Sequence, residues 1–512
     1  MRLFCNEYLS YPIPARAASR QCRRQVRVRR SAVSRSRSFL RGANLAGDMV
    51  AVMPLYGGSM SMDNIKTIII VMMENRSFDH VLGYLSLDGK DVNGLSADPA
   101  WQQNFANLYD DRTYAIHALS PATQLIPDPP HDRTPISIQI NTPCASGGCP
   151  ELGGFVASYA ARHPAPADLS MVMGYYTADA LPVYDFFANH FTICDSWFAP
   201  LPTGTQANRL MAMSGESAIS DNVSGFLPQQ SLVYDWLTAH ATSWCVYQSG
   251  GFFPFFSLMP KWLPEIVTSL ALPLDGIGGR FRRYSRFKAD WTNGSNMPQV
   301  IFIEPEYTDG PHRTPNDDHS PTGVAPGQAF LADIYQTIST SERWNETLMI
   351  VTYDEHGGFF DHVSPLDIPT DVAGYRFQTT GLRVPAFLIS PYVTPGGVFS
   401  GDLDHTSILQ LLADKFNAGG TYSAPVSART QLSKLSSALS EMKTPGPAPR
   451  LNVPMPGNSP VPSPVSQPVG LSACAQAFRS VALKVQQDHP EMLSSPNWGD
   501  LAGFVATYKG AS

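Results

Sequence analysis

Two apolar runs in this 512-residue sequence each end at a group of carboxylate and amide side chains. The groups are Glu74 with Asn75, after residues 65–73, and Asp354 with Glu355 and His356, after residues 348–353. Neighbouring carboxylates repel one another in a folded chain unless a cation neutralises them. Oxygen ligands from two strand ends can surround one divalent ion. We therefore predict a single divalent metal ion, of unspecified identity, held by both groups.

A nucleophilic hydroxyl is expected in the segment APLPTGTQANRL at residues 199–210. Two prolines and a glycine precede a run that suits a helix, and such a strand-to-helix turn offers backbone N–H groups to an anion. The turn contains Thr203 and Thr205. A metal beside one of these hydroxyls would lower its pKa and place it for attack. In the competing interpretation, Thr205 is only the N-cap of the helix.

Four apolar runs that end at polar residues predict the strands of a central sheet. They are residues 65–73, 299–304, 348–353 and 384–390. Such runs are typical of parallel strands buried on both faces, and ligands bind where these strands end. Helical spacing is found at residues 153–163, at 181–198, where a helix turns into a short strand, and at 327–339, 404–416 and 471–487.

Three motifs resemble those of one known family, in the same order. ENRSFDH at 74–80, Asn208-Arg209 and TYDEHGGFFDH at 352–362 are similar to motifs of the phosphoesterase family of bacterial and plant non-specific phospholipases C and related acid phosphatases. The resemblance covers about residues 65–415. It implies an α/β fold, an alkaline-phosphatase-like α/β/α sandwich with a central mostly parallel sheet and a cap or lid insertion at about 211–295. The aromatic run at 250–256 would either form a lid that meets lipid or, as we favour, pack against the sheet.

The resemblance also implies roles for single residues. The family has a threonine three residues before Asn-Arg, which selects Thr205 over Thr203 as the nucleophile that forms a phosphothreonine intermediate. His131 matches a histidine that contacts phosphate, although its loop alone indicates a surface turn. His319 matches the first of two histidines, and the second falls on Thr322. If that second histidine protonates the leaving group, another residue must do so here.

The predicted site thus has catalytic residues, metal ligands and supporting residues. The catalytic residues are Thr205, His131 and His319; the metal ligands are Glu74, Asn75, Asp354, Glu355 and Thr205; and the supporting residues are His356, Asn208 and Asp318. For His356, direct coordination of the metal and support of another ligand are both open. We expect Asp361 and His362 to lie in a supporting shell or at the surface. Asp404 or His405 would cap the following helix, where family members have a similar His-Ser/Thr pair.

The ends of the chain differ in composition from its middle. Residues 1–41 contain eleven arginines and one acidic residue, Glu7, in a chain of net charge −7. We predict a disordered basic arm at 1–60, with a transit peptide or a start codon placed too far upstream as alternatives. The phosphoesterase domain would span 61–442, followed by a Pro-rich linker at 443–470 and a helical tail at 471–512 that docks on the domain.

Targeting signals and cysteine positions add little to the prediction of localisation and disulfides. No run of 18 apolar residues and no clear signal peptide is present, so we predict no membrane span and leave the localisation open, although the family often works outside the cytoplasm. Seven cysteines are too few for a disulfide scaffold, although Cys144 and Cys149 could close a small loop.

The predicted function is metal-dependent hydrolysis of phosphate esters. We favour a phospholipase C that cleaves the phosphodiester of phospholipids, and the alternatives are an acid phosphatase acting on monoesters and a non-catalytic relative that binds a phosphorylated ligand. The partner would be a phospholipid or a small phosphate ester, with peripheral membrane contact in the first case. Outside the Arg-rich arm nothing indicates a nucleic-acid partner.

Overall fold

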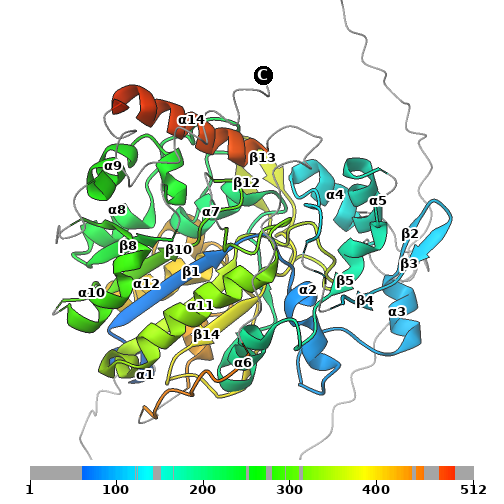
Figure 1. The fold of residues 1–512 in the computed structure, drawn as a ribbon, viewed down its shortest axis with the longest axis horizontal. Helices are drawn as coiled ribbons and strands as arrows, with labels where there is room; N and C mark the ends of the chain where they lie inside the picture. The colour runs from blue at the N-terminus through cyan, green and yellow to red at the C-terminus, as the bar shows by residue number, and fades with distance from the viewer. Residues whose placement is uncertain are drawn as a thin grey trace, which may run out of the picture. The chain divides into compact units, whose positions relative to one another are not determined.

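A central sheet of eight strands runs through the computed structural model, in the order β15-β6-β14-β11-β1-β10-β8-β9 (Figure 1). The strands are β1 (Thr67–Met73), β6 (Thr192–Cys194), β8 (Trp244–Gln248), β9 (Phe281–Arg283), β10 (Val300–Glu304), β11 (Thr347–Tyr353), β14 (Ala386–Ile389) and β15 (Val398–Phe399). β14 pairs antiparallel with both of its neighbours, and the other pairings are parallel.

The structure describes most of the unit that spans Gly57–Ser512. The described residues are 60–120, 123, 125–141, 152–164, 167–249, 253–271, 279–294, 296–310, 315–440, 445–454 and 472–490. The predicted arm at 1–60, except its last residue, the Cys144–Cys149 loop, most of the predicted linker and the last 22 residues therefore lie outside the described residues. None of the described helices has the length and apolar character needed to cross a membrane.

β1 and β11 lie side by side at the centre of the sheet and bring the two predicted ligand groups together. Every residue of β11 is buried, as is every residue of β1 except Met72. These long β-branched and apolar runs fill both faces of the sheet, as expected for parallel strands covered by helices. The register pairs Met73 with Tyr353. Glu74 and Asp354, the next residues, therefore leave the sheet at the same edge.

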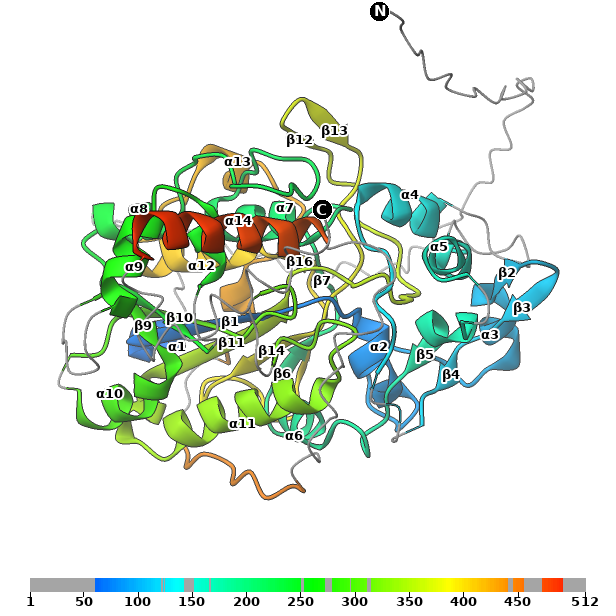
Figure 2. The same ribbon diagram turned by 45° about the horizontal axis from the view of Figure 1, so that its top comes forward.

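Helices cover both faces of the sheet, which confirms the predicted α/β/α sandwich (Figures 1 and 2). On one face lie α6 (Pro182–His190), α10 (Phe287–Asn293) and α11 (Val324–Ser339); on the other lie α7 (Thr205–Ser214), α8 (Val233–Ala239), α9 (Leu263–Ala271), α12 (Thr406–Phe416) and α14 (Ala473–Asp488). Their buried residues form one hydrophobic core with the strands.

The smaller elements lie around this sandwich. The short helices are α1 (Met60–Asn64), α2 (Phe78–Leu82), α3 (Pro99–Phe105), α4 (Arg133–Asn141), α5 (Phe155–Arg162) and α13 (Ala424–Ser427), with 3-10 turns η1 (Gly83–Ser86), η2 (Leu169–Met173), η3 (Phe255–Leu258), η4 (Tyr284–Arg286), η5 (Glu342–Glu346) and η6 (Leu435–Ala438). The short strands pair as β2 (Asn107–Tyr109) with β3 (Arg112–Tyr114), β4 (His117–Ala118) with β5 (Gly174–Tyr175), β7 (Trp197–Phe198) with β16 (Leu403–Asp404), and β12 (Thr370–Val372) with β13 (Tyr375–Phe377).

The prediction of a cap-like insertion at about 211–295 is wrong. This segment supplies β8 and β9, and β8 pairs in parallel with β10, with Trp244 opposite Val300. Several of its aromatic residues are buried: Tyr234 stacks on Trp244 with ring centroids 4.5 Å apart, and Phe255 is 1% exposed. These large apolar rings therefore extend the core beside the sheet, and the described residues of the aromatic run, 253–256, are buried as we favoured.

The C-terminal helix α14 packs onto the same core. Its Phe478 is 1% exposed and stacks on Tyr307 with centroids 5.7 Å apart, and it also contacts Phe255. The described start of the predicted linker lies against the core as well, because the Tyr335 hydroxyl donates to the carbonyl of Pro449 at 2.6 Å. Cys474 on this helix is a free, buried thiol.

Replacing Phe478 tests how firmly α14 is held. Phe478→Ala is expected to lower the free energy of unfolding by about 3–5 kcal/mol, because it removes a buried ring from a packed cluster. Leu483→Ala, on the same helix but 39% exposed, is expected to change it by less than about 0.5 kcal/mol. Urea denaturation of both variants gives the comparison, and equal midpoints would show that α14 contributes no stability.

Candidate active site

The turn after β1 is shaped around Asn75. Its φ of 61° lies in the left-handed region, which asparagine tolerates better than most residues. Its backbone N–H donates to Asp354 Oδ1 at 3.1 Å and so ties the ends of β1 and β11 together. Ser77 then caps α2, since its hydroxyl accepts from the N–H of His80. The ENRSFDH motif thus provides a tight turn from the strand into a helix.

The side-chain amide of Asn75 lies between carboxylates and histidines. With its nitrogen toward the carboxylates, it donates to Glu355 Oε1 at 2.9 Å and Asp354 Oδ1 at 3.0 Å, and its oxygen accepts from His319 Nε2 at 2.8 Å and His131 Nε2 at 3.3 Å. All four contacts are then hydrogen bonds. In this orientation both polar atoms of the amide have hydrogen-bond partners.

When its oxygen and nitrogen exchange positions, the same amide completes a cluster of oxygens. Its oxygen then faces Asp354 Oδ1 and Glu355 Oε1, and Thr205 Oγ1 lies 3.5 Å away. Oxygen ligands at about 2.1 Å from one cation lie about 3 Å apart around it, which matches the two shorter separations. Four oxygens from four buried residues therefore fit a small divalent ion, which would favour this orientation of the amide. The predicted ligands that lie together in the structure are Asn75, Asp354, Glu355 and Thr205.

Thr205 is the first residue of α7, and the cap position is held by Gly204. The interpretation of Thr205 as an N-cap is therefore wrong. Thr203 points elsewhere, because its hydroxyl donates to the Ser220 carbonyl at 3.1 Å. Asn208 fixes the turn: its amide accepts from the Leu201 N–H and donates to the carbonyl of Thr203 at 2.7 Å. Asn208 thus supports the position of Thr205 through the backbone.

Arg209 supplies positive charge beside the oxygen cluster. It is 4% exposed and lies 3.1 Å from Glu74 Oε1 and 3.3 Å from Asp354 Oδ2. It also donates to the carbonyl of Met73 and to the Tyr307 hydroxyl. Burial alone would lower its pKa, but Tyr307 and the two carboxylates outweigh burial and raise it. We did not predict Arg209, although it follows Asn208 in the motif that located Thr205.

Glu74 stands beside this cluster. Its two oxygens lie 3.1 Å from Arg209 and 3.1 Å from His319 Nδ1, and burial raises its pKa. Among the described residues, Glu74, Asp354 and Glu355 do not form a group with all ligand atoms within 4.8 Å of one another. Metal coordination by Glu74 stays a prediction, and in the structure Glu74 links Arg209 to His319.

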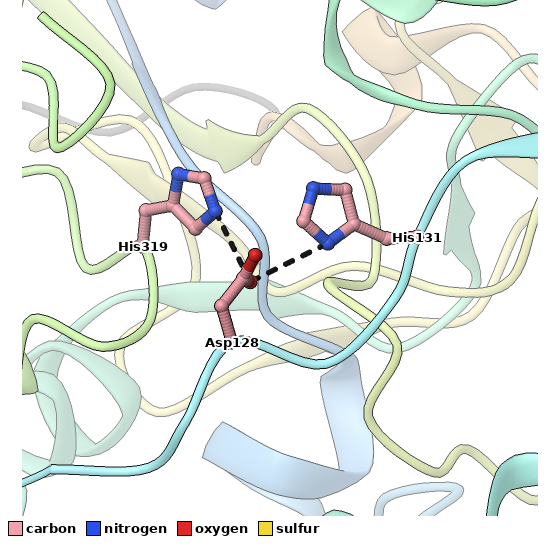
Figure 3. Close-up of side chains that lie close together, drawn as sticks. All are labelled: Asp128, His131 and His319. Carbon is pink, nitrogen blue, oxygen red and sulfur yellow. Dashed lines mark ion pairs between the residues drawn. The ribbon is translucent and has the colours of Figure 1, made fainter. Parts of the chain in front are cut away.

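Asp128 joins the two predicted catalytic histidines (Figure 3). Its Oδ1 lies 3.3 Å from His319 Nε2 and 3.6 Å from His131 Nδ1. Burial favours the neutral carboxyl, but the two histidines outweigh it and lower the pKa of Asp128 to about 2. Burial likewise opposes the imidazolium forms, yet Asp128 raises the pKa of His131 and raises that of His319 well above its usual range. Asp128 was missed, although it begins the DPPHD segment that contains His131.

The two histidines come from loops that other contacts hold. His131 Nδ1 lies 2.7 Å from the carbonyl of Pro129, and the backbone N–H of His319 donates to Asp317 at 3.1 Å. Thr322, where relatives have a second histidine, lies 2.9 Å from the Thr308 hydroxyl, which donates to Asp317. Thr322 therefore stabilises the His319 loop.

The supporting residues differ in what they touch. His356 Nδ1 lies 3.3 Å from Glu355 Oε2, and its Nε2 lies 2.8 Å from Gln139 Oε1, so His356 holds a ligand in place. Asp318 contacts two tyrosines, because its Oδ2 accepts from the hydroxyls of Tyr184 and Tyr353. Burial raises the pKa of Asp318 to about 6. Its side chain supports the loop, and it was expected closer to the ligands.

Two further groups lie outside the catalytic cluster. Asp79, Asp361 and His362 have ligand atoms close together, but Arg383 already lies 3.0 Å from Asp79 and 2.9 Å from Asp361. This buried ion-pair network has its own cation, which fits the supporting role expected for Asp361. His405 is the N-cap residue of α12, as predicted, and it also lies beside the site, because its Nε2–H donates to the Asp354 carbonyl at 2.7 Å.

Comparison with known proteins identifies the family of the chain. The Phosphoesterase family profile matches residues 65–419. The chain belongs to this family. It is 33% identical over 382 residues to non-specific phospholipase C1 of Arabidopsis thaliana, covering 69% of this chain and 67% of that protein. It is 29% identical over 408 residues to phospholipase C A of Mycobacterium tuberculosis, covering 69% of this chain and 73% of that one.

The chain thus spans about two thirds of the length of the Arabidopsis relative. Among solved structures, the phosphonate monoester hydrolase of Agrobacterium radiobacter is 10% identical, with a TM-score of 0.33 over 69% of this chain and 74% of that one. The family assigns the chain to the hydrolases that act on phosphate ester bonds.

The close approach of Gly357 to Asn75 can be tested by adding one methyl group. Gly357 has a φ of 66°, and a Cβ there would lie 2.0 Å from the Asn75 carbonyl oxygen. Gly374 has a φ of 78° with open space around it. Gly374→Ala should cost about 1–2 kcal/mol of left-handed strain. Gly357→Ala should cost this plus about 1–3 kcal/mol of overpacking, measured by urea denaturation. Equal losses would contradict the close approach.

Replacing Asp128 should change the pH at which the two histidines titrate. In chelator-treated protein, Asp128→Asn is expected to lower the pKa of His319 and of His131, because burial then acts without the opposing carboxylate. NMR titration of the imidazole signals measures both values, and Asp168→Asn, at an exposed position, is the control.

The pH dependence of the free energy of unfolding should also change in this variant. The raised pKa of His319 stabilises the folded wild type fully below about pH 6.5, and this contribution is lost as pH rises through the folded pKa. The variant should lose that dependence. Unchanged histidine titrations would show that Asp128 does not control them.

Proposed function

We propose that this protein is a phospholipase C that hydrolyses phospholipid phosphodiesters through a phosphothreonine intermediate, with a divalent metal ion as cofactor. The observation that carries the proposal is the cluster of Thr205, Asn75, Asp354 and Glu355 oxygens beside His131 and His319. The relatives named phospholipase C support the diester substrate.

Thr205 is the nucleophile in this proposal. The Thr205 hydroxyl gives its proton to solvent, and Oγ1 attacks phosphorus and forms a bond to it. The bond from phosphorus to the diacylglycerol oxygen breaks as that oxygen takes a proton from His131 or His319. The threonine stands at the start of α7, where the positive end of the helix dipole favours the phosphoryl charge. Water then attacks the phosphothreonine and releases the phosphorylated headgroup.

His131 and His319 hold the phosphoryl oxygens and give a proton to the leaving alcohol. Their raised pKa values favour the charged imidazolium forms, which suit an anionic group. Asp128 keeps them charged and oriented. This pair replaces the second histidine of relatives, because Thr322 has no ionisable proton to give.

The metal would be held by Asn75, Asp354, Glu355 and Thr205, with Glu74 as a further ligand once it leaves Arg209 or His319. When bound, it would lower the pKa of the Thr205 hydroxyl and stabilise negative charge on the phosphoryl oxygens. Arg209 balances the carboxylates that the ion does not neutralise.

Exposed apolar side chains beside the site favour a lipid surface as the partner. Leu125 lies three residues before Asp128, Ile138 is on α4 after His131, and Tyr375 is on the β12–β13 hairpin; they are 37%, 41% and 44% exposed. Apolar side chains at the rim of a polar site are typical of peripheral contact with lipid. They support contact of this edge with the membrane interface.

The testing experiment compares diester and monoester substrates. The protein is assayed with phosphatidylcholine or phosphatidylglycerol in detergent micelles and with p-nitrophenyl phosphate, with and without chelator. We expect faster hydrolysis of the diesters, loss on chelation and recovery with a divalent ion. Preference for the monoester at acid pH would make the protein an acid phosphatase, and binding without turnover would make it a non-catalytic relative.

Two threonine variants test the nucleophile. Thr205→Ala is expected to lower kcat by about 10³-fold or more, because the covalent step is lost. Thr203→Ala is the matched control and should cost only about 1 kcal/mol of stability for its hydrogen bonds to Ser220 and Asp221. Acid quenching followed by peptide mass spectrometry should find phosphate esterified to Thr205. A Thr205→Ala enzyme with near-normal kcat would refute the nucleophile.

A further inference from the structure

A cleft of about 360 Å³ lies between α4, the β12–β13 hairpin and the turn before α7. α4 and the hairpin lie side by side in both ribbon views (Figures 1 and 2), and Arg133 on α4 lies over the ring of Tyr375 on the hairpin, 4.4 Å from its centroid. This volume is within the range of sites for small molecules.

The cleft adjoins the phosphate site. Arg133, in its lining, is two residues from His131, and Pro202, also in the lining, is three residues from Thr205. A chain covers at most about 3.6 Å per residue, so these lining Cα atoms lie within about 7 Å and 11 Å of those of His131 and Thr205. Asp221 links the two walls, because it accepts from the Arg133 N–H and from the Thr203 hydroxyl. A group attached to phosphorus at Thr205 can therefore reach the cleft.

The chemistry of the lining is polar. It contains two arginines, Arg133 and Arg376, one carboxylate, Asp367, and, besides Tyr375, five uncharged hydrogen-bonding side chains. Both arginines already face a carboxylate, Arg133 that of Asp221 at 3.9 Å and Arg376 that of Asp371 at 2.7 Å. Of these five, Gln378 and Ser364 are exposed, and their side chains make no hydrogen bond to another described residue. Such groups can bind hydroxyls of a ligand.

A quaternary ammonium group suits this cleft poorly. Cation recognition uses the open face of an aromatic ring. One face of the Tyr375 ring is covered by the Arg133 guanidinium, whose charge repels a second cation at that ring. Hydroxyl groups meet neither obstacle.

We infer that this cleft binds the headgroup of the substrate and selects an uncharged, hydroxyl-rich headgroup, such as glycerol or inositol, over choline. The inference rests on the proposed phospholipase C function and deepens it. Arg133 and Gln378 are the specificity-determining side chains, and they act on the alcohol that stays on phosphorus when diacylglycerol leaves.

The test compares phosphatidylglycerol, phosphatidylcholine and phosphatidylmethanol with the same acyl chains, in the same excess of neutral detergent. Phosphatidylmethanol has the charge of phosphatidylglycerol but lacks the hydroxyls that would fill the cleft. We expect kcat/KM for phosphatidylglycerol to exceed both other values by about tenfold, the effect of one or two hydrogen bonds. Diacylglycerol release measures all three rates.

Arg133→Gln and Gln378→Ala are each expected to lower the phosphatidylglycerol to phosphatidylmethanol ratio severalfold. Arg112→Gln, at an exposed position on β3, is the control and should leave the ratio as in the wild type. Gln378 is exposed, so its variant tests the inference even if loss of the Arg133 contacts with Ser220 and Tyr375 disturbs folding.

Two outcomes would overturn the headgroup inference alone: phosphatidylcholine hydrolysed as fast as phosphatidylglycerol, or a ratio unchanged in both variants while all lipids are cleaved. If no lipid is cleaved, including phosphatidylmethanol, the proposed phospholipase function fails and the headgroup inference falls with it. Hydrolysis of p-nitrophenyl phosphate in the same preparation would then show a phosphatase.

Discussion

Buried negative charge at the carboxyl edge of the sheet is the constraint that the rest of the site must satisfy. Glu74, Asp354 and Glu355 are each at most 2% exposed, and removing such ions from water costs several kcal/mol each unless cations compensate. Arg209 provides one compensating charge. Phe478 packs on Tyr307, and Tyr307 accepts from Arg209, so even the C-terminal helix contributes to holding that charge in place.

The strand ends could be predicted from the sequence, because β1 and β11 are long apolar runs whose period and abrupt ends are local signals. The register that places Met73 beside Tyr353 is not local. The carboxylates at the two strand ends therefore predicted one shared ion, but not which atoms of Asn75, Asp354 and Glu355 would meet. Arg209 and Asp128 were missed because their roles depend on partners more than a hundred residues away. β8 was misjudged because its aromatic-rich run lacks the Val and Ile pattern of the other strands.

The two histidines gain their charge from an arrangement that neither loop has alone. His131 and His319 are far apart in the chain, and each would be less basic when buried by itself. One carboxylate between them reverses that tendency for both. The protonation state of the site therefore depends on how the two loops dock, and a change in either loop would alter the basicity of the other.

β14 is the one strand of the central sheet that runs backwards. Parallel strands present the loops that follow them at the carboxyl edge, whereas a reversed strand presents there the loop that precedes it. Residues 361–385, with the β12–β13 hairpin, reach the catalytic edge for this reason. This loop joins no pair of parallel neighbours, so its length can change without shifting β1 or β11. The β12–β13 hairpin can thus change in length while the turns after β1 and β11 keep their register.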